Sequence, residues 1–161
     1  MRIATLYILS FKLCKPREWR ESAVINERYG SYDDIQNIPD RLCWLRCKMR
    51  LMQAEVAEQI GMSPYAYKSI EEGITHHVDK EMRERLAGFF GIPALDLLDE
   101  FNQFLEDGQG HRIRAWRSRT GLSRQAFAGR YGIPVRNLKA WEEEKSAVSY
   151  KSWEKYFKGR A

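Results

Sequence analysis

The chain is poor in the residue types that mark several large classes of protein. Its 161 residues include only three cysteines and three histidines. The three thiols, Cys14, Cys43 and Cys47, argue against the paired disulfide framework of a small secreted domain. The sequence also lacks a glycine-rich phosphate loop, a metalloprotease motif, a nucleophile elbow and paired carboxylates in an apolar context. We therefore expect a protein that is not an enzyme and that carries no cofactor.

Long hydrophobic runs are missing as well. The apolar-rich segment 1–13 is interrupted by Lys12 after roughly ten residues, which is too short to span a bilayer. Its only basic flank is Arg2, and no small-residue cleavage site follows, so a secretory signal is not expected. We expect a cytoplasmic protein with no membrane contact. Apolar residues alternate along segment 1–13, which predicts a β-strand, although a helix fits so short a run almost equally well.

A zinc site can be imagined from the few cysteines and histidines. Cys43 and Cys47 lie one helical turn apart, and His76 and His77 follow downstream. The thiol spacing differs from the loop-borne pairs of structural zinc sites and falls inside a predicted helix. Buried or half-exposed thiols are the simpler interpretation. We expect no metal site.

What the sequence does have is an uneven distribution of charge. Residues 1–39 carry a net charge of +1, residues 40–107 carry −5 and residues 108–161 carry +9. A concentration of lysine and arginine in one part of a chain is typical of proteins that bind nucleic acid. The last part also contains a cluster of arginines on or near its first predicted helix, at Arg112, Arg114, Arg117 and Arg119. The C-terminal part therefore has the charge of a nucleic-acid binder, and the middle part does not.

The chain also contains an internal repeat. Segment 42–72 is followed, 71 residues later, by a second copy at 113–143. Seven aligned positions are identical, and seven more are apolar in both copies. The apolar positions recur at helical spacing. We expect two small helical units of about 55–65 residues each, a size that is only marginally able to fold alone.

Each copy contains the signals of two helices joined by a tight turn. Gly61 and Gly132 can take the left-handed conformation that ends a helix, because glycine has no Cβ. Ser63 can cap the helix that follows, while Pro134 at the same position can supply only its fixed φ. An alanine four residues before each glycine is small enough for two helices to cross closely.

These residues resemble the pattern of the lambda-repressor/Cro (XRE) family of helix-turn-helix proteins. That pattern runs from an Arg through a Gln, an Ala, a Gly, an apolar residue and a Ser to a Glu near the end of the third helix. The first copy carries Arg46, Gln53, Ala57, Gly61, Met62, Ser63, Ile70, Glu71 and Gly73, and the second carries Arg117, Gly121, Leu122, Ser123, Ala128, Gly132, Ile133, Trp141 and Glu142. The resemblance covers residues 42–105 and 113–158. It implies an all-α protein with two tandem lambda-repressor-like domains.

The expected domains are an N-terminal extension, a first helix-turn-helix domain and a second helix-turn-helix domain, at residues 1–39, 40–107 and 108–161. The glycine-containing segment 106–110 is the predicted linker between the last two. Asp40 and Asp79 are the predicted caps of two helices in the first domain, the second of them at residues 80–90. Pro93 is predicted to open a fifth helix of that domain. Ser149 is predicted to begin the last helix of the second.

The resemblance implies two structural ion pairs. In the family the Arg and the Glu pair across the fold, which here implies Arg46–Glu71 and Arg117–Glu142. A guanidinium can bind a carboxylate through two hydrogen bonds from a fixed direction. The alternative is two unrelated surface charges, which recurrence in both copies disfavours. The second copy departs from the pattern at Glu144, where a Gly would follow the third helix, so the path of its next loop is left open.

The resemblance also implies which residues contact double-stranded DNA. In this family the start of the third helix lies in the major groove, and the preceding helix contacts phosphate. The candidates in the second copy are Arg124, Val135, Arg136, Lys139 and Ala140. Arg136 can donate to a guanine and Val135 can contact a thymine methyl, while Arg124 and Lys139 suit phosphate. A solvated basic face is the alternative interpretation.

The first copy is a weaker candidate for DNA binding. Gln53, Tyr65, Lys68 and Ser69 occupy the corresponding positions. Pro64, however, has no side-chain donor where family members often contact a base, and acidic residues follow the third helix. A unit that keeps the fold with a net negative charge suits dimerisation or binding of a protein. Whether this copy contacts DNA is left open.

Two functions follow from the resemblance. The first is a sequence-specific transcriptional regulator of the phage or mobile-element repressor type, which acts on its operator as a homodimer. The second is an interaction protein that reuses the fold and has a protein target, such as an antitoxin or an anti-CRISPR protein. The net charge of −5 on residues 40–107 favours the second, because an acidic surface can imitate nucleic acid toward a basic partner. One chain could serve both functions.

Overall fold

The computed structural model describes residues 23–160, and every regular element in that range is a helix. The all-α class expected from the sequence is therefore confirmed over these residues. The strand predicted within residues 1–13 lies outside the described residues. None of the helices in residues 23–160 combines the length and apolar character that a bilayer crossing requires.

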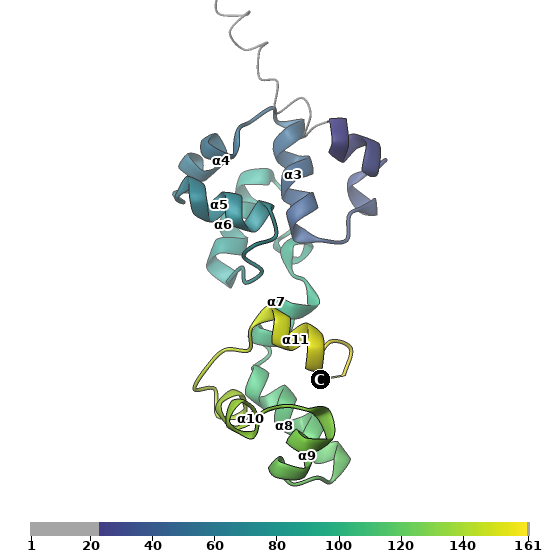
Figure 1. The fold of residues 1–161 in the computed structure, drawn as a ribbon. Helices are drawn as coiled ribbons and strands as arrows, with labels where there is room; N and C mark the ends of the chain where they lie inside the picture. The colour runs from purple at the N-terminus through teal and green to yellow at the C-terminus, as the bar shows by residue number, and fades with distance from the viewer. Residues whose placement is uncertain (1–22, 161) are drawn as a thin grey trace, which may run out of the picture. The chain divides into compact units, whose positions relative to one another are not determined.

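The helices are short and are separated by tight turns (Figure 1). Residues 23–28 are helical. The elements after them are η1 (Tyr32–Asp34), α3 (Ile38–Lys48), α4 (Gln53–Gln59), α5 (Pro64–Glu71), α6 (Lys80–Phe90), η2 (Ala94–Leu97), α7 (Glu100–Glu106), α8 (Gln109–Thr120), α9 (Arg124–Tyr131), α10 (Val135–Glu142) and α11 (Tyr150–Tyr156), where η marks a 3₁₀ helix.

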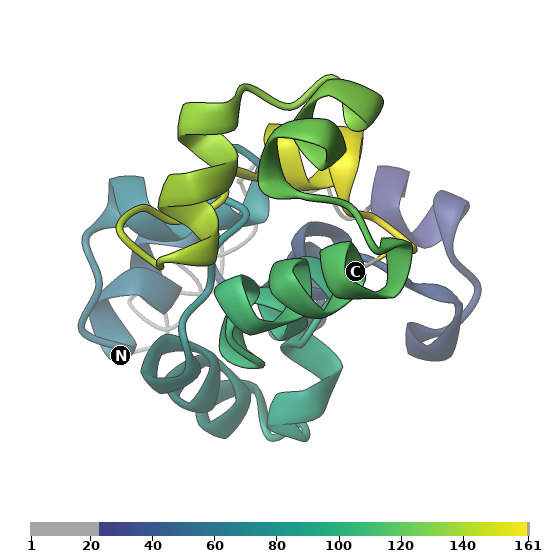
Figure 2. The same cartoon turned by 90° about the horizontal axis from the view of Figure 1, so that it is seen from below.

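The chain divides into two compact units whose boundaries differ from those expected. Among the described residues, the first unit contains 23–75 and 85–93, and the second contains 76–84 and 94–160. In the first unit α5 packs against α3 and α4. In the second unit α8 packs against α7, α9 and α10 (Figures 1 and 2).

Helix α7 packs in the second unit, although the sequence predicts its residues to belong to the first domain. Phe101 and Phe104 belong to the same buried cluster as the apolar residues of α8–α11. The Phe101 ring lies 5.5 Å from that of Trp153, and Phe104 stacks on Phe157 at 5.6 Å between ring centroids. Aromatic pairs at such distances add to the gain from burial. The apolar spacing predicted a helix here, but it could not show which unit would cover its apolar face.

The segment that precedes α6 is held in the second unit by hydrogen bonds. The buried Asn102 of α7 donates to the carbonyl oxygen of His76 at 2.9 Å and accepts from the amide of Val78 at 2.9 Å. Arg83 in the first half of α6 pairs with Glu106 at 2.5 Å. The division between the units consequently falls inside α6, between residues 84 and 85.

The prediction of a linker at 106–110 is wrong for residues 109 and 110, which belong to α8. Gln109 and Gly110 are the first two residues of α8, and both are buried. The Gln109 amide group donates to the carbonyl oxygen of Ser146 and accepts from the amide of Val148, both at 2.7 Å. The partners lie more than 35 residues away along the chain. The local glycine content that predicted a linker could not reveal them.

The predicted helix starts are correct in part. Asp79 accepts from the amide of Met82 at 2.8 Å and caps α6 as expected. The cap of α3, however, is Asn37, which accepts from the amide of Asp40 at 2.8 Å. The Asp40 carboxylate instead accepts a hydrogen bond of 2.6 Å from the hydroxyl of Tyr29. Asp40 therefore ties the residues that precede α3 to that helix.

Of the two later helix starts, only one follows the prediction. The single fifth helix predicted from Pro93 is instead the 3₁₀ turn η2 followed by the separate helix α7, which Asp99 caps. Ser149 accepts from the amide of Ser152 at 3.3 Å and caps α11 as predicted.

Candidate nucleic-acid interface

The 71-residue repeat of sequence is matched by a repeat of local structure at the two turns. Gly61 between α4 and α5 has a φ of 68°, and Gly132 between α9 and α10 has a φ of 66°. The predicted left-handed turns are therefore present. Ser63 caps α5 by accepting from the amide of Ala66 at 3.2 Å, whereas Pro134 precedes α10 without a side-chain cap.

Left-handed residues recur at three equivalent positions of the two copies. The first is the pair of turn glycines. The other two are Arg50 with Gly121 and Gly73 with Glu144, and these four residues have φ between 54° and 67°. The path of the loop after α10, which the sequence left open, thus begins like the path after α5. The Glu144 carboxylate accepts a hydrogen bond of 3.1 Å from the amide of Gly110. This contact helps to hold a conformation that side chains disfavour.

The pair Arg46–Glu71 is formed in the core of the first unit. The Nε atom of Arg46 lies 2.9 and 3.0 Å from the two carboxylate oxygens of Glu71, and Nη2 lies 2.5 Å from Oε1. Their side chains are 1% and 3% exposed. Arg46 also donates to the carbonyl oxygen of Leu51 at 3.0 Å, and Gln53 donates to Glu71 at 3.2 Å. Nearly every polar atom of this buried pair is thus satisfied.

The pair Arg117–Glu142 is formed in the second unit with the same geometry. Nε of Arg117 donates to Oε1 of Glu142 at 2.6 Å, and Nη1 donates to the carbonyl oxygen of Leu122 at 3.3 Å. Arg124, which aligns with Gln53, donates from Nε to Oε2 of Glu142 at 2.8 Å. Arg114 also bonds to the carbonyl oxygen of Glu142. We call Arg117, Arg124 and Glu142 the Glu142 clamp.

The two arginines set the ionisation of Glu142. Burial by itself raises the pKa of this carboxyl, but the hydrogen bonds and charges of Arg117 and Arg124 outweigh it and hold the pKa below its ordinary value. Glu142 is therefore an anion at neutral pH. The clamp joins the end of α10 to α8 and to the start of α9, and so it fixes the orientation of α10.

Helix α10 has one buried face and one exposed face. Leu138, Trp141 and Glu142 are buried, while Val135 is 46% exposed and Arg136 and Lys139 are exposed. Within residues 23–160, neither Arg136 nor Lys139 has a hydrogen-bond or ion-pair partner. Ala140 is half-buried between the two faces. Of the residues that the resemblance implied, Val135, Arg136 and Lys139 therefore lie together on one accessible helix face.

Arg124 lies in a position that the sequence analysis did not foresee. Its side chain is 36% exposed, and it pairs with Glu142 and lies 3.8 Å from Glu143. One edge of the guanidinium is thus occupied by the clamp. The guanidinium carries five N–H donors, and because the side chain is 36% exposed, donors on its other edge can reach solvent or a ligand.

The corresponding residues of the first unit form a less basic surface. Tyr65 is 76% exposed, but Lys68 lies 3.7 Å from Glu72, and Gln53 is engaged by Glu71. Ser69 is 4% exposed, so its side chain is shielded from the groove that the resemblance implied it would contact. The helical spacing of the apolar residues around Ser69 could have predicted that it lies on the buried face of α5.

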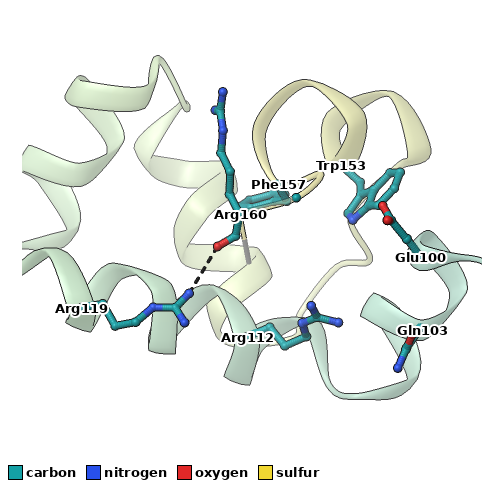
Figure 3. A pocket seen from close by; sticks show the side chains of 8 residues that line it. Glu100, Gln103, Arg112, Arg119, Trp153, Phe157 and Arg160 are labelled. Carbon is teal, nitrogen blue, oxygen red and sulfur yellow. Dashed lines mark hydrogen bonds between the residues drawn. The ribbon is translucent and has the colours of Figure 1, made fainter.

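The arginine cluster at the start of the second copy is divided between two sides of α8. Arg114 and Arg117 contact Glu142. Arg112 and Arg119 line a pocket that the sequence analysis did not identify (Figure 3). Their separation of seven residues, two turns of a helix, was the signal that could have found it.

The imagined zinc site has no counterpart in the described part of the chain. No group of three or more His, Cys, Asp and Glu side chains in residues 23–160 is placed to hold a metal ion. Cys43 and Cys47 are half-buried. Hydrogen bonding to Cys47 and burial raise the pKa of Cys43 above its ordinary value, so its reactive thiolate form is disfavoured.

Comparisons of the chain with protein-family models, with curated proteins and with solved structures found no match. The geometry of α8, α9 and α10 and the charges that they carry are therefore the grounds for a proposed function.

Proposed function

We propose that the second unit binds double-stranded DNA with the start of α10 in the major groove, as a sequence-specific transcriptional regulator of the helix-turn-helix type. The observation that carries the proposal is the exposed face of α10. Arg136 has no partner within residues 23–160, and it stands in the first turn beside the exposed Val135. An α-helix fits the major groove, where an arginine can donate two hydrogen bonds to a guanine.

Phosphate contacts would supply most of the affinity. Lys139 lies one turn after Arg136 on α10, and the accessible edge of Arg124 lies at the start of α9. Residues 108–161 carry a net charge of +9, which favours association with a polyanion through release of counterions. These contacts position the protein, and Arg136 and Val135 supply the preference for particular bases.

The Glu142 clamp supports the proposal because it holds the reading helix in place before binding. Sites that are ordered in advance lose less entropy when they bind. A regulator of this type would act as a homodimer on two half-sites whose centres lie about 34 Å apart, one turn of the duplex.

The experiment is a binding-site selection from random DNA duplexes with the full chain. We expect one enriched motif and an affinity that falls steeply with salt, because several phosphates are contacted. Arg136→Ala should relax the preference at one base position, at a cost of about 1–3 kcal/mol. The matched control is Lys151→Ala, which removes one exposed charge from α11 and leaves α10 unchanged. Absence of any enriched motif would contradict the proposal.

A second candidate function, binding of a protein by the first unit, is favoured by its exposed apolar side chains. Tyr65 at the start of α5 is 76% exposed, and Met49 and Met52 are 47% and 40% exposed. Tyrosine and methionine are enriched at protein interfaces. A partner captured by the full chain after nuclease digestion should be lost in Tyr65→Ser and retained in Arg136→Ala. The reverse pattern would exclude the first unit as the binding surface.

A further inference from the structure

The first copy of the repeat exposes large apolar side chains at positions where the second copy is polar. Four large apolar side chains in residues 42–74 are between 40% and 76% exposed: Met49, Met52, Tyr65 and Ile74. The residues that stand 71 positions later are all polar: Thr120, Ser123, Arg136 and Lys145. Within residues 113–145 the one exposed large apolar side chain is Val135. We call Met49, Met52, Tyr65 and Ile74 the apolar surface.

The fold does not require these four side chains to be apolar. The second copy forms the corresponding helices and turns with a threonine, a serine, an arginine and a lysine at these positions. Single exposed apolar residues are common on proteins and need no explanation. An apolar residue at four equivalent exposed positions is different, because apolar area left in water costs free energy and the unit gains no burial from it. Contact with another molecule would supply that burial.

Met49 and Met52 lie on either side of one turn. Met49 ends α3, and Met52 directly precedes α4. Arg46 of α3 holds this turn, since it donates to the carbonyl oxygen of Leu51 at 3.0 Å and its own carbonyl oxygen accepts from the amide of Leu51 at 3.2 Å. The backbone of both methionines is thus fixed, while their unbranched side chains can adapt to a partner.

Tyr65 and Ile74 lie near the two ends of α5. Tyr65 is the second residue of that helix, and Ile74 follows it, where its amide donates to the carbonyl oxygen of Ser69 at 2.8 Å. The same end of α5 is held to the start of α4 by the hydrogen bond from Gln53 to Glu71. Helix α5 has eight residues and is about 12 Å long. The apolar surface therefore lies at the ends of three helices that pack together, within the span of one protein interface (Figure 1).

The first unit does not carry the negative charge that the sequence assigned to the middle of the chain. The whole excess of −5 in residues 40–107 lies in 94–107, which contain five acidic residues, no lysine and no arginine. These residues belong to the second unit. The described residues of the first unit contain seven lysines and arginines and eight aspartates and glutamates. Such a balanced charge favours neither a polyanion nor a strongly basic partner.

A second copy of this chain is the partner that fits such a surface. In a two-fold dimer the same surface meets itself, so its charges must be compatible with one another. The balanced charge of the first unit meets this condition, and Lys68 and Glu72 on α5 supply one exposed charge of each sign. Interfaces between identical subunits are also more apolar than other interfaces, and aromatic residues and methionine are enriched in them.

We propose that two copies of the chain associate through the apolar surfaces of their first units, with Tyr65 as the main anchor. The inference rests on the second candidate function, binding of a protein by the first unit, and names that protein as a second copy. It assigns no role to α10, so it does not depend on DNA binding by the second unit.

The test is sedimentation equilibrium of the full chain, without DNA, over a range of concentrations. We expect a reversible equilibrium between monomer and dimer. In NMR of the methionine methyl groups, dilution should shift the signals of Met49 and Met52, assigned with Met49→Thr and Met52→Ser, and leave that of Met82 on α6 unchanged. A chain that stays monomeric at every concentration overturns the proposal.

The second copy supplies the variants, because it folds with polar residues at these positions. Tyr65→Arg should weaken the dimer by about tenfold or more, since it removes an aromatic anchor and brings an unpaired charge into the interface. Ile74→Lys should act in the same direction. The matched control is Leu95→Arg, because Leu95 is 74% exposed and lies in the second unit, and it should leave the dimer unchanged. Circular dichroism checks that each variant is folded. If neither Tyr65→Arg nor Ile74→Lys weakens the dimer, or if Leu95→Arg weakens it equally, the assigned surface is wrong.

Other occupants of the surface give different results. If the chain is monomeric and a different protein is captured through Tyr65, protein binding by the first unit stands and the second copy is wrong as the partner. If duplex DNA shifts the Met49 and Met52 signals of Arg136→Ala, the surface contacts DNA and the inference is overturned. Arg136→Ala should retain the dimer, so a failure of the DNA-binding proposal is seen separately.

Discussion

Gln53 and Arg124 make the same contact 71 residues apart. Each is the first residue of its helix, and each donates a hydrogen bond to the buried glutamate near the end of the next helix, at 3.2 Å to Glu71 and at 2.8 Å to Glu142. The first unit therefore balances one buried carboxylate with one arginine, whereas the second uses two. The additional positive charge lies beside the helix for which we propose DNA binding.

The first prediction concerns this exchange. Arg124→Gln should give the second unit the neutral arrangement of the first, since Arg117 still pairs with Glu142. We expect a loss of about 0.5–1.5 kcal/mol in the free energy of unfolding, measured in urea, because one partly exposed charged hydrogen bond becomes a neutral one. In DNA binding the salt slope should fall by about 1. An unchanged salt slope would show that Arg124 contacts no phosphate.

The second prediction concerns Glu142, whose pKa is lower in the folded protein than in the unfolded chain. Its stabilisation is therefore fully present above the unfolded pKa, about 4.3 for a glutamate, and is lost as the pH falls through the folded pKa. Urea unfolding at a series of pH values should show this loss below about pH 4. Glu142→Gln should flatten the slope in that range.

The same variant should also be less stable at neutral pH. Glu142→Gln leaves two arginines beside a buried neutral group, and breaking such a pair costs about 3–5 kcal/mol. Glu143→Gln is the matched control, because Glu143 is more exposed and adjacent in sequence, and it should change stability by less than about 0.5 kcal/mol. Equal losses in both variants would contradict a structural role for the clamp.

The third prediction uses the equivalent positions 50 and 121. Arg50 has a φ of 56° and Gly121 a φ of 67°. Arg50→Gly should raise the free energy of unfolding by about 0.5–1 kcal/mol, because relief of the left-handed strain exceeds the entropy that glycine gains in the unfolded chain. Gly121→Ala should lower it by about 1 kcal/mol. No atom lies within 4 Å of an added Cβ at Gly121, so the loss reports backbone conformation alone. Thermal unfolding followed by circular dichroism measures both.

The fourth prediction compares two glycines inside helices. A Cβ at Gly110 of α8 would lie 2.7 Å from the carbonyl oxygen of Glu142 and 2.8 Å from Cγ of Glu144. Gly110→Ala should therefore destabilise the second unit by about 1–3 kcal/mol through overpacking. Gly129→Ala in α9 should stabilise it by up to about 1 kcal/mol, because the site is open and alanine favours a helix. Similar effects of both changes would show that α8 and the end of α10 are not in close contact.

The sequence by itself determined the features that depend on near neighbours in the chain. Apolar spacing predicted the helices, Gly61 and Gly132 predicted the left-handed turns, and Ser63, Asp79 and Ser149 predicted caps, because each of these depends on a few consecutive residues. The buried Arg–Glu pairs were implied by the family pattern that both copies share. The exposed face of α10 also follows from the helical period, because the apolar residues of this helix mark the opposite, buried face.

Only the tertiary structure decided which surfaces meet. Apolar spacing shows that a helix face is buried, but not what covers it. Helix α7, expected in the first domain, lies in the second compact unit, where Phe104 stacks on Phe157. Gln109 was mistaken for a linker residue because its hydrogen-bond partners lie more than 35 residues away. The pocket beside Arg112 and Arg119 has the same origin, since it exists only where α7, α8 and the segment after α11 come together.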